Sequence, residues 1–377
     1  MVKSDDKNSS KNRYLFAGAG TGGHLYPAIA LAEEIQRTEK TAEILFVGTS
    51  RGIENKVLPQ TQWPLRRIAV RGFKRKLSFE NIVFPIRLIM SMLQAVNILK
   101  EFKPHVVVGT GGYVSGPVVF AAWLLGIPRL IQEQNALPGV TTRMLSRISN
   151  EVFVSFTESL RYFKNMERLK VSGNPVRRRP ENIKRTKACE TLGLDARLKT
   201  VLVFGGSQGA HSINAALYSA LDTLMQKKDV QIVWGTGIHD FEDAGKIAKK
   251  YNNRVLVKAY IENMPVVYQA TDVAVCRAGA ITISELELFG LPALLIPYPF
   301  AAARHQEENA RTLQEHNAAR MILDEELTGP RLIQELSAIL DNETKRLSMA
   351  ENMANLARPD ATKEIVQSIR ALAARYS

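Results

Sequence analysis

Cysteine is nearly absent from this 377-residue chain, in which Cys189 and Cys276 are the only two. Two cysteines so far apart exclude a disulfide-built domain and a zinc knuckle, and they favour a reducing compartment. Charged residues (23%) and hydrophobic residues (45%) occur in ordinary globular proportions, which excludes a disordered or collagen-like protein. At about 150 residues per domain, the length predicts two domains.

The sequence also lacks a long unbroken apolar run. Its longest uncharged stretch, residues 104–128, is interrupted by several glycines and by Pro117, so we interpret it as a buried strand, a glycine loop and a buried helix. Residues 1–12 are polar and contain no apolar segment, which predicts a disordered tail and not a signal peptide. We therefore expect no integral membrane segment.

Acidic residues are scarce in the first half of the chain. Residues 1–180 hold 27 Lys and Arg against 13 Asp and Glu, so the whole net charge of +13 originates there. The densest basic segment runs from Arg66 to Lys76 without an acid. This asymmetry favours a polyanion or an anionic membrane surface as a partner, and a solvated basic face is the alternative. The candidate membrane patch consists of Arg71, Phe73, Lys74, Arg75, Lys76 and Leu77.

Short β-branched runs alternate with helix-length segments along the whole chain. The predicted strands are 14–17, 44–47, 106–109, 129–132 and 152–154, then 200–204, 230–233, 255–257, 273–275 and 293–296. The predicted helices are 27–37, 81–102, 115–125 and 139–148, then 210–225, 241–251, 281–289 and 305–316. This alternation predicts an α/β protein with two Rossmann-like, doubly wound domains, joined within residues 174–185.

Each half opens with a glycine loop after its first strand. Gly18, Gly20, Gly22 and Gly23 precede a helix expected to begin at Pro27, and 205–209 precede a helix expected at Ala210. Glycines permit close approach of the backbone to a ligand, and a helix start presents N–H groups to an anion. Two such loops predict a cleft with one loop on each wall.

The first loop also matches a dinucleotide fingerprint at Gly18, Gly20 and Gly23. A nicotinamide site needs an acid at the end of the second strand, about 20 residues further on, to bind the ribose hydroxyls. Here that strand ends in Val47-Gly48-Thr49-Ser50, without an acid. NAD binding therefore stays only as an alternative.

Three features of the first half suit chemistry at a cleft. His24 lies at a helix start and has a near-neutral pKa suited to proton transfer, or it caps the helix. The polar run 132–135 after a buried strand is poor core material and suits sugar hydroxyls. Arg177 is placed to bind a diphosphate, or it is one more basic linker residue.

The second half offers nucleotide-binding features. Ser207 lies in the second glycine loop, and the helix start at 280–284 presents N–H groups to a phosphate. Glu285 is placed to accept both ribose hydroxyls, or it is a favourable first-turn acid. The six histidines are scattered and no two aspartates flank a single residue, so we expect no bound metal.

Taken in order, these turns resemble the MurG family of bacterial peptidoglycan glycosyltransferases (glycosyltransferase family 28). The motifs that carry the resemblance are Gly20-Thr21-Gly22-Gly23-His24, Gly111-Gly112-Tyr113-Val114-Ser115-Gly116-Pro117, Glu133-Gln134-Asn135, Gly173-Asn174-Pro175-Val176, Gly205-Gly206-Ser207-Gln208-Gly209-Ala210 and Gly290-Leu291-Pro292-Ala293. The chain departs from the family pattern at Ala19, often glycine, and at Ala278, usually serine.

The resemblance implies a GT-B fold and an inverting transfer of GlcNAc from UDP-GlcNAc to lipid I, giving lipid II, without a required cofactor. It implies an acceptor and membrane-side domain over 13–177, a UDP-GlcNAc-binding domain over 178–358, and a C-terminal helix (359–377) that crosses back to the first domain. The implied location is peripheral, at the cytoplasmic face of the inner membrane. The implied partners are the two substrates, the anionic membrane surface and other cell-wall synthesis proteins, but not nucleic acid.

The resemblance also assigns residues to roles. It implies His24 as the general base, with Glu133 as second candidate. The implied UDP-GlcNAc-binding residues are Thr21, Gly22, Gly23, Asn135, Arg177, Ser207, Ile261, Ala280, Ile281, Thr282, Ile283, Ser284, Glu285 and Gln306. A UDP-sugar epimerase, a different glycolipid transferase and a basic nucleic-acid-binding protein are the alternative functions.

Overall fold

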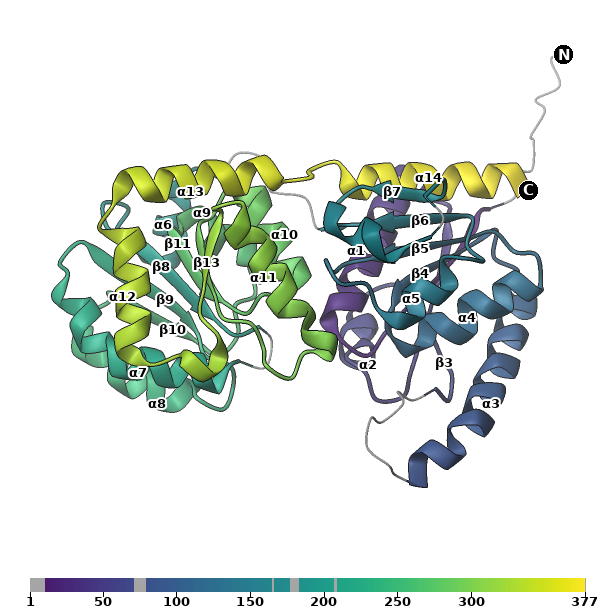
Figure 1. Ribbon diagram of the computed structural model, residues 1–377, viewed down its shortest axis with the longest axis horizontal. Coiled ribbons are helices and arrows are strands. Elements are labelled where there is room, and N and C mark those ends of the chain that lie inside the picture. The colour runs from purple at the N-terminus through teal and green to yellow at the C-terminus, as the bar shows by residue number, and fades with distance from the viewer. Residues whose placement is uncertain (1–10, 71–78, 165, 177–182, 207–208, 377) are drawn as a thin grey trace, which may run out of the picture. The chain divides into compact units, whose positions relative to one another are not determined.

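The computed structural model describes residues 11–70, 79–164, 166–176, 183–206 and 209–376. It divides into two compact units (Figure 1): unit 1 is Met1–Val176 with Asp360–Ser377, and unit 2 is Arg177–Pro359. Each unit contains one parallel sheet with helices on both of its faces. The predicted fold class, two Rossmann-like domains, is therefore confirmed.

Unit 1 contains a seven-stranded sheet of order β3-β2-β1-β4-β5-β6-β7, and all neighbouring strands are parallel. Its strands are β1 (Arg13–Gly18), β2 (Glu43–Gly48), β3 (Leu65–Arg67), β4 (Val106–Gly111), β5 (Arg129–Glu133), β6 (Glu151–Val154) and β7 (Leu169–Val171). Its helices are α1 (Gly22–Thr38), α2 (Glu54–Val57), α3 (Phe79–Phe102), α4 (Gly112–Leu124), α5 (Val140–Leu145) and α14 (Ala361–Tyr376).

The two faces of the unit 1 sheet bury alternate residues of the same strands. Phe16 and Val108 face a core made with α1 and α14, whereas Leu15 and Val107 face a core made with α3 and α4. Strands buried on both faces are continuous runs of apolar residues, as in 106–108. The C-terminal helix α14 buries Ile365 and four other apolar residues in the first of these cores, beside α1.

Unit 2 contains a six-stranded parallel sheet of order β10-β9-β8-β11-β12-β13. Its strands are β8 (Lys199–Phe204), β9 (Val230–Gly235), β10 (Val255–Lys258), β11 (Val273–Cys276), β12 (Ala293–Leu295) and β13 (Ala319–Met321). Its helices are α6 (Arg185–Leu192), α7 (His211–Gln226), α8 (Phe241–Ala248), α9 (Met264–Ala270), α10 (Ala280–Phe289), α11 (His305–Glu315), α12 (Gly329–Leu340) and α13 (Glu343–Leu356).

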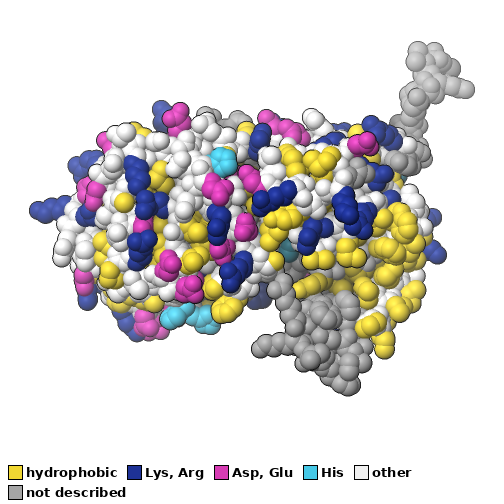
Figure 2. Space-filling model, in the orientation of Figure 1, with side chains coloured by type: hydrophobic (Ala, Val, Ile, Leu, Met, Phe, Trp, Pro, Cys, Tyr) yellow, Lys and Arg dark blue, Asp and Glu magenta, His cyan; other side chains and the backbone are white. Residues whose placement is uncertain are grey.

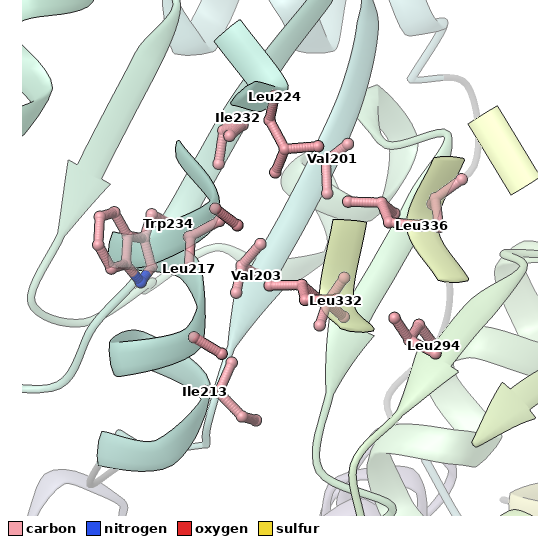
Figure 3. Packing of buried hydrophobic residues seen from close by; sticks show 14 of the residues in the cluster. Val201, Val203, Ile213, Leu217, Leu224, Ile232, Trp234, Leu294, Leu332 and Leu336 are labelled. Atoms are coloured by element: carbon pink, nitrogen blue, oxygen red, sulfur yellow. The ribbon is translucent and has the colours of Figure 1, made fainter. Parts of the chain in front are cut away.

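One face of the unit 2 sheet is covered by α7 and α12. Figure 3 shows Leu217 of α7 and Leu332 of α12 beside Val203 of the central strand β8. Trp234 is fully buried in the same cluster, and its indole N–H donates to Asn214 Oδ1 at 2.9 Å. On the opposite face, the rings of Phe204 and Tyr268 meet edge to face.

The structure extends the predicted elements and corrects two helix starts. All ten predicted strands occur, and β3, β7 and β13 are additional short strands. Helix α1 begins at Gly22 and not at Pro27, because Thr21 O already accepts from the N–H groups of His24 and Leu25. Helix α4 likewise begins at Gly112 and not at residue 115. No helix in the described ranges is long and apolar enough to cross a membrane.

Candidate active-site residues in each unit

Each sheet has one place where the strand order reverses. In unit 1 the chain leaves β1 toward β2 on one side and leaves β4 toward β5 on the other, and in unit 2 the pair is β8 and β11. In open parallel sheets, ligands bind at the carboxyl ends of the two strands at this reversal. We call this part of each unit its switch edge, and both predicted glycine loops lie there.

The first glycine loop positions His24 in the first turn of α1. Gly20 adopts a positive φ of 96°, which glycine tolerates and other residues rarely adopt. The next residue, Thr21, is extended and is the N-cap of α1. Its Oγ1 lies 3.0 Å from His24 Nδ1, so the loop fixes the orientation of the imidazole as well as the helix start.

The imidazole lies against the end of β4. A Cβ placed on Gly111 would come within 2.3 Å of His24 Cδ2, so glycine at this position leaves room for the ring. Thr110 Oγ1 donates to the backbone oxygen of His24 at 2.8 Å. The two strands of the switch edge therefore hold the half-buried His24 between them, at the place where unit 1 is expected to bind a ligand.

Most of the polar run 132–135, at the end of β5, is internal. Gln132, Glu133 and Gln134 are at most 4% exposed, and Gln134 Nε2 donates to Thr110 O at 2.7 Å. The expectation that all four side chains of the run face a ligand is therefore wrong for these three. Their side chains bond other parts of unit 1: Gln132 Nε2, for example, donates to Ser155 Oγ after β6 at 3.0 Å and to Asn174 Oδ1 after β7 at 3.2 Å. Only Asn135 is partly exposed.

The carboxylate of Glu133 is occupied by local N–H groups. Its Oε1 accepts from Asn135 N and Nδ2 at 3.1 and 3.2 Å, and its Oε2 accepts from Gly139 N at 3.1 Å. Because Gly139 is the N-cap of α5, Glu133 connects the end of β5 to that helix. This arrangement favours a structural role for Glu133, and it makes His24 the better candidate for a general base.

Sequence reasoning missed Glu54, a fully buried acid at the start of α2. Its Oε1 accepts from Thr49 N at 2.7 Å, and its Oε2 accepts from Gly20 N of the first glycine loop at 3.0 Å. A carboxylate therefore does lie beside the end of β2, although strand 2 itself ends without one. Since Glu54 is 0% exposed and bonded to the loop, it is not placed to bind a ribose.

The second glycine loop approaches the neighbouring backbone closely. Gly209 has a φ of 77°, and a Cβ there would come within 2.2 Å of Thr236 O. Ser207 of this loop and Arg177 lie outside the described residues, as does the candidate membrane patch, whose members are Arg71, Phe73, Lys74, Arg75, Lys76 and Leu77. The loop leads into α7 at His211, one residue after the predicted start.

Helix α10 begins on the other side of the unit 2 switch edge. Its N-cap is Gly279, so the first-turn N–H groups of Ala280, Ile281 and Thr282 lie at the positive end of the helix, which favours an anion. Ile283 N donates back to Gly279 O at 2.9 Å, and the Ile283 side chain is buried. Ser284 begins the second turn.

Glu285 follows in α10 and is oriented by a buried phenol. Tyr268 OH donates to Glu285 Oε2 at 2.9 Å. Burial, together with the nearby Glu285 carboxylate, raises the pKa of Tyr268 well above its ordinary value, so the phenol keeps its proton and remains a donor. This contact fixes one carboxylate oxygen of the partly exposed Glu285.

A largely buried ion pair supports the unit 2 switch edge. The guanidinium of Arg277 forms an ion pair with Asp324. It also donates hydrogen bonds to Ile296 O at 3.2 Å and to Ser212 Oγ at 2.9 Å. Arg277 therefore links α7, the end of β12 and the turn at Asp324–Glu326. The buried Asn309 of α11 donates to Ala278 O at 3.2 Å, which holds the segment before α10.

Two further predicted residues of unit 2 are Ile261, in the loop after β10, and Gln306, in α11. The Ile261 side chain packs over Gly235, where a Cβ would meet Ile261 Cδ1 at 3.0 Å. Gln306, in the first turn of α11, accepts from Tyr298 N at 2.9 Å through its side-chain oxygen. Within the described ranges, no group of three or more His, Cys, Asp or Glu side chains is arranged to hold a metal ion.

Comparisons with known proteins cover almost the whole chain. Residues 14–154 match the glycosyltransferase family 28 N-terminal domain, and residues 200–365 match its C-terminal domain. The UDP-N-acetylglucosamine–N-acetylmuramyl-(pentapeptide) pyrophosphoryl-undecaprenol N-acetylglucosamine transferase of Thermoanaerobacter sp. (strain X514) is 43% identical over 96% of this chain and 100% of that protein. The protein of the same name from Bacillus subtilis (strain 168) is 40% identical over 96% of this chain and 99% of its own length.

Solved structures show the same relationship. The crystal structure of Acinetobacter baumannii MurG has a TM-score of 0.75 and 30% identity, over 96% of this chain and 99% of that one. A putative UDP-N-acetylglucosamine 2-epimerase from Listeria monocytogenes has a TM-score of 0.67 at 11% identity, over 96% of both chains, and so shares the fold. From the two domain matches and these relatives, it follows that the chain belongs to glycosyltransferase family 28.

Proposed function

We propose that this protein transfers GlcNAc from UDP-GlcNAc to the MurNAc 4-hydroxyl of undecaprenyl-pyrophosphoryl-MurNAc-pentapeptide (lipid I), giving lipid II with inversion at the anomeric carbon. One observation carries this proposal: relatives about 43% identical over their full length are named for that transfer. The geometry agrees, since unit 1 presents an imidazole and unit 2 presents a helix start and a carboxylate at the edges where parallel sheets bind ligands.

In this proposal His24 is the general base. The acceptor hydroxyl attacks the anomeric carbon from the face opposite UDP, and His24 removes the hydroxyl proton. A base at Nε2 requires the other ring nitrogen to carry a proton. Thr21 Oγ1, at 3.0 Å from Nδ1, is positioned to accept a hydrogen bond from Nδ1–H and so to favour that tautomer. Glu133 is the less favoured base, because three N–H groups occupy its oxygens.

Unit 2 is proposed to bind the nucleotide. The N-terminal part of α10, Ala280 to Ser284, would hold phosphate, and Glu285 would accept the ribose hydroxyls through a carboxylate oriented by Tyr268. Ile261 would contact uracil through its backbone, Gln306 the donor sugar, and Arg177 and Ser207 the diphosphate. Thr21, Gly22, Gly23 and Asn135 would contact the GlcNAc group. Helix starts and arginine then stabilise the departing UDP without a metal cofactor.

We also propose that unit 1 binds the anionic cytoplasmic surface of the inner membrane peripherally. One face of α3 is exposed and apolar, with Ile86, Ile89, Met90 and Leu93 each 48–61% exposed, whereas Ala95 and Leu99 of the same helix are buried. Val140 and Met144 of α5 are also exposed. Figure 2 shows apolar side chains gathered over this part of unit 1. Apolar side chains together with the basic segment before α3 suffice for peripheral attachment.

One assay tests the proposed reaction. The protein is incubated with UDP-GlcNAc labelled in the sugar, with and without a lipid I analogue, and the label is followed. The proposal expects label in the lipid product only when the acceptor is present. Free labelled sugar without acceptor would instead support the epimerase alternative, whose fold is similar. For the membrane, stronger co-sedimentation with anionic than with neutral vesicles is expected, and equal binding would contradict the electrostatic part.

A further inference from the structure

Glu54 connects the end of β2 to the first glycine loop, although it lies more than 30 residues from that loop in sequence. It is 0% exposed, and its carboxylate accepts three hydrogen bonds. Oε1 accepts from Thr49 N at 2.7 Å and Thr49 Oγ1 at 2.9 Å, whereas Oε2 accepts from Gly20 N at 3.0 Å. One oxygen therefore serves the local turn and the other serves the glycine loop.

Two glycines leave the space that this carboxylate occupies. A Cβ on Gly52 would come within 1.9 Å of Glu54 Oε2, and a Cβ on Gly48 would come within 2.7 Å of Glu54 Cγ. Side chains at positions 48 and 52 would therefore clash with the Glu54 side chain, whose carboxylate contacts the first glycine loop. Hydrogen bonds to a charged acceptor are stronger than neutral ones, so this contact is a firm constraint on the loop.

The bond from Gly20 to Glu54 affects the imidazole of His24 through Thr21, the residue that follows Gly20. The bond from Gly20 N fixes the peptide plane before Gly20, and Gly20 then turns with a φ of 96° into Thr21. Thr21 is the N-cap of α1 and places its Oγ1 3.0 Å from His24 Nδ1. A change in the backbone conformation at Gly20 would therefore move the Thr21 hydroxyl that orients His24.

We infer that Glu54 is a positioning residue for the transfer reaction: through Gly20 and Thr21 it holds His24 in its reactive orientation and tautomer without touching either substrate. This inference rests on the proposed function. The simpler role would be to stabilise the turn at 49–54 alone. That role predicts a loss of stability when Glu54 is changed, but no change in the turnover of molecules that remain folded.

The test uses two variants that break the same contact by different chemistry. In Glu54→Gln the two donors of Thr49 keep the remaining side-chain oxygen at its present place. The new amide NH₂ then faces the N–H of Gly20, and because both groups are donors they cannot form a hydrogen bond. In Gly52→Ala the carboxylate keeps its charge, but the added methyl displaces Oε2 from the loop. Glu34→Gln is the matched control, because Glu34 is a buried acid of the same unit that pairs with Arg37 on the far part of α1.

Three quantities are measured on the full-length protein below its unfolding transition, and the Tm of each variant is measured separately. We expect kcat for lipid I glycosylation to fall at least tenfold in Glu54→Gln and in Gly52→Ala, while the Kd for UDP changes less than twofold. Hydrogen exchange of the amides at 18–25 should accelerate in both variants. Glu34→Gln should change none of these three quantities. In Glu54→Gln and Gly52→Ala, the loss of kcat should occur at temperatures well below the Tm of the variant, where the protein is folded.

Each outcome decides the inference. Wild-type kcat in folded Glu54→Gln and Gly52→Ala, or unchanged exchange at 18–25, would overturn it. A parallel loss of UDP affinity would also overturn it, because it would show general damage instead of a misplaced base. If Glu54→Gln does not fold, Gly52→Ala alone decides. The exchange measurement needs no substrate, so the inference about the loop can fail or hold even if the wild-type protein proves inactive toward lipid I.

Discussion

The two units use the same sheet topology but support their switch edges with side chains of opposite charge. In unit 1 the buried carboxylate of Glu54 accepts hydrogen bonds from Gly20 N of the glycine loop and from Thr49 N of the turn after β2. In unit 2 the largely buried guanidinium of Arg277 donates to the backbone carbonyls of Ile296 and Pro297 and to Asp324. A carboxylate accepts from the backbone N–H groups of the unit 1 edge, and a guanidinium donates to the backbone carbonyls of the unit 2 edge, so each side chain satisfies the buried polar groups around it.

This difference leaves different groups available at the two edges. In unit 1, Glu54 bonds the first glycine loop, and the loop orients the imidazole of His24. An imidazole is the side chain suited to proton transfer near neutral pH. Unit 2 presents the N-terminus of α10, which is suited to a permanent anion. In the proposed function, proton transfer belongs to unit 1 and binding of the diphosphate to unit 2, and the predictions below test this division.

The largest expected effect is on turnover when His24 is removed. His24→Ala should lower kcat by about 10²- to 10⁴-fold, the range supplied by general base catalysis. The Kd for UDP should stay within twofold of the wild-type value, because the nucleotide is assigned to unit 2. Steady-state kinetics with a lipid I analogue and calorimetry with UDP measure the two quantities. Undiminished turnover would remove His24 from the mechanism.

The next effect is on the stability of unit 2. Arg277→Met leaves the largely buried Asp324 without its guanidinium, and breaking a buried ion pair costs about 3–5 kcal/mol. Urea unfolding should show this loss, and UDP binding should weaken because α7 and the end of β12 lose their common link. The double variant Arg277→Met/Asp324→Leu should recover much of the stability. A single-variant loss below about 1 kcal/mol would show that the pair is not a support of this edge.

The sequence predicts the repeating elements well and the supports of the switch edges poorly. Runs such as 106–108 and 201–203 are apolar on both faces and fit only central parallel strands, so both sheets follow from pattern. The short edge strand β3 ends in two exposed arginines and carries no such pattern. Glycine loops and His24 are visible because glycine followed by a helix start is a local signal.

Contacts between distant residues carry no comparable signal. The bond of Glu54 to Gly20 joins two segments 34 positions apart, and nothing near Glu54 marks it as buried except the glycines beside it. The interpretation of the polar run 132–134 was wrong for the same reason. Its partners are distant in sequence, among them Thr110 O at the end of β4 and Asn174 after β7. A single sequence shows polar residues after a strand, but not whether they face a ligand or each other.

A smaller effect concerns the alkaline stability of unit 2. Burial, with the nearby Glu285, raises the pKa of the Cys276 thiol far above its ordinary 9.0. Above pH 9 the unfolded chain loses this proton while the native protein keeps it, so the native state loses stability as pH rises. Between pH 9 and 10.5 the stability advantage of wild type over Cys276→Ala should shrink steadily in urea titrations. Burial also raises the pKa of Tyr14, but Cys276 does not contribute to that shift, so Tyr14 cancels in this comparison. A pH-independent difference would contradict the prediction.

The smallest expected effect separates the surfaces of the two units. Ile89 and Leu93 of α3 are 59% and 61% exposed, and Leu347 of α13 in unit 2 is 55% exposed. If the α3 face enters a lipid surface, the double variant Ile89→Ser/Leu93→Ser should bind anionic vesicles about tenfold more weakly, since it removes apolar groups from the interface. Leu347→Ser is the matched control and should bind like wild type. Equal losses in both proteins would show that exposed apolar residues bind vesicles wherever they lie, and the distinction between a membrane-binding unit 1 and a nucleotide-binding unit 2 would lose its physical basis.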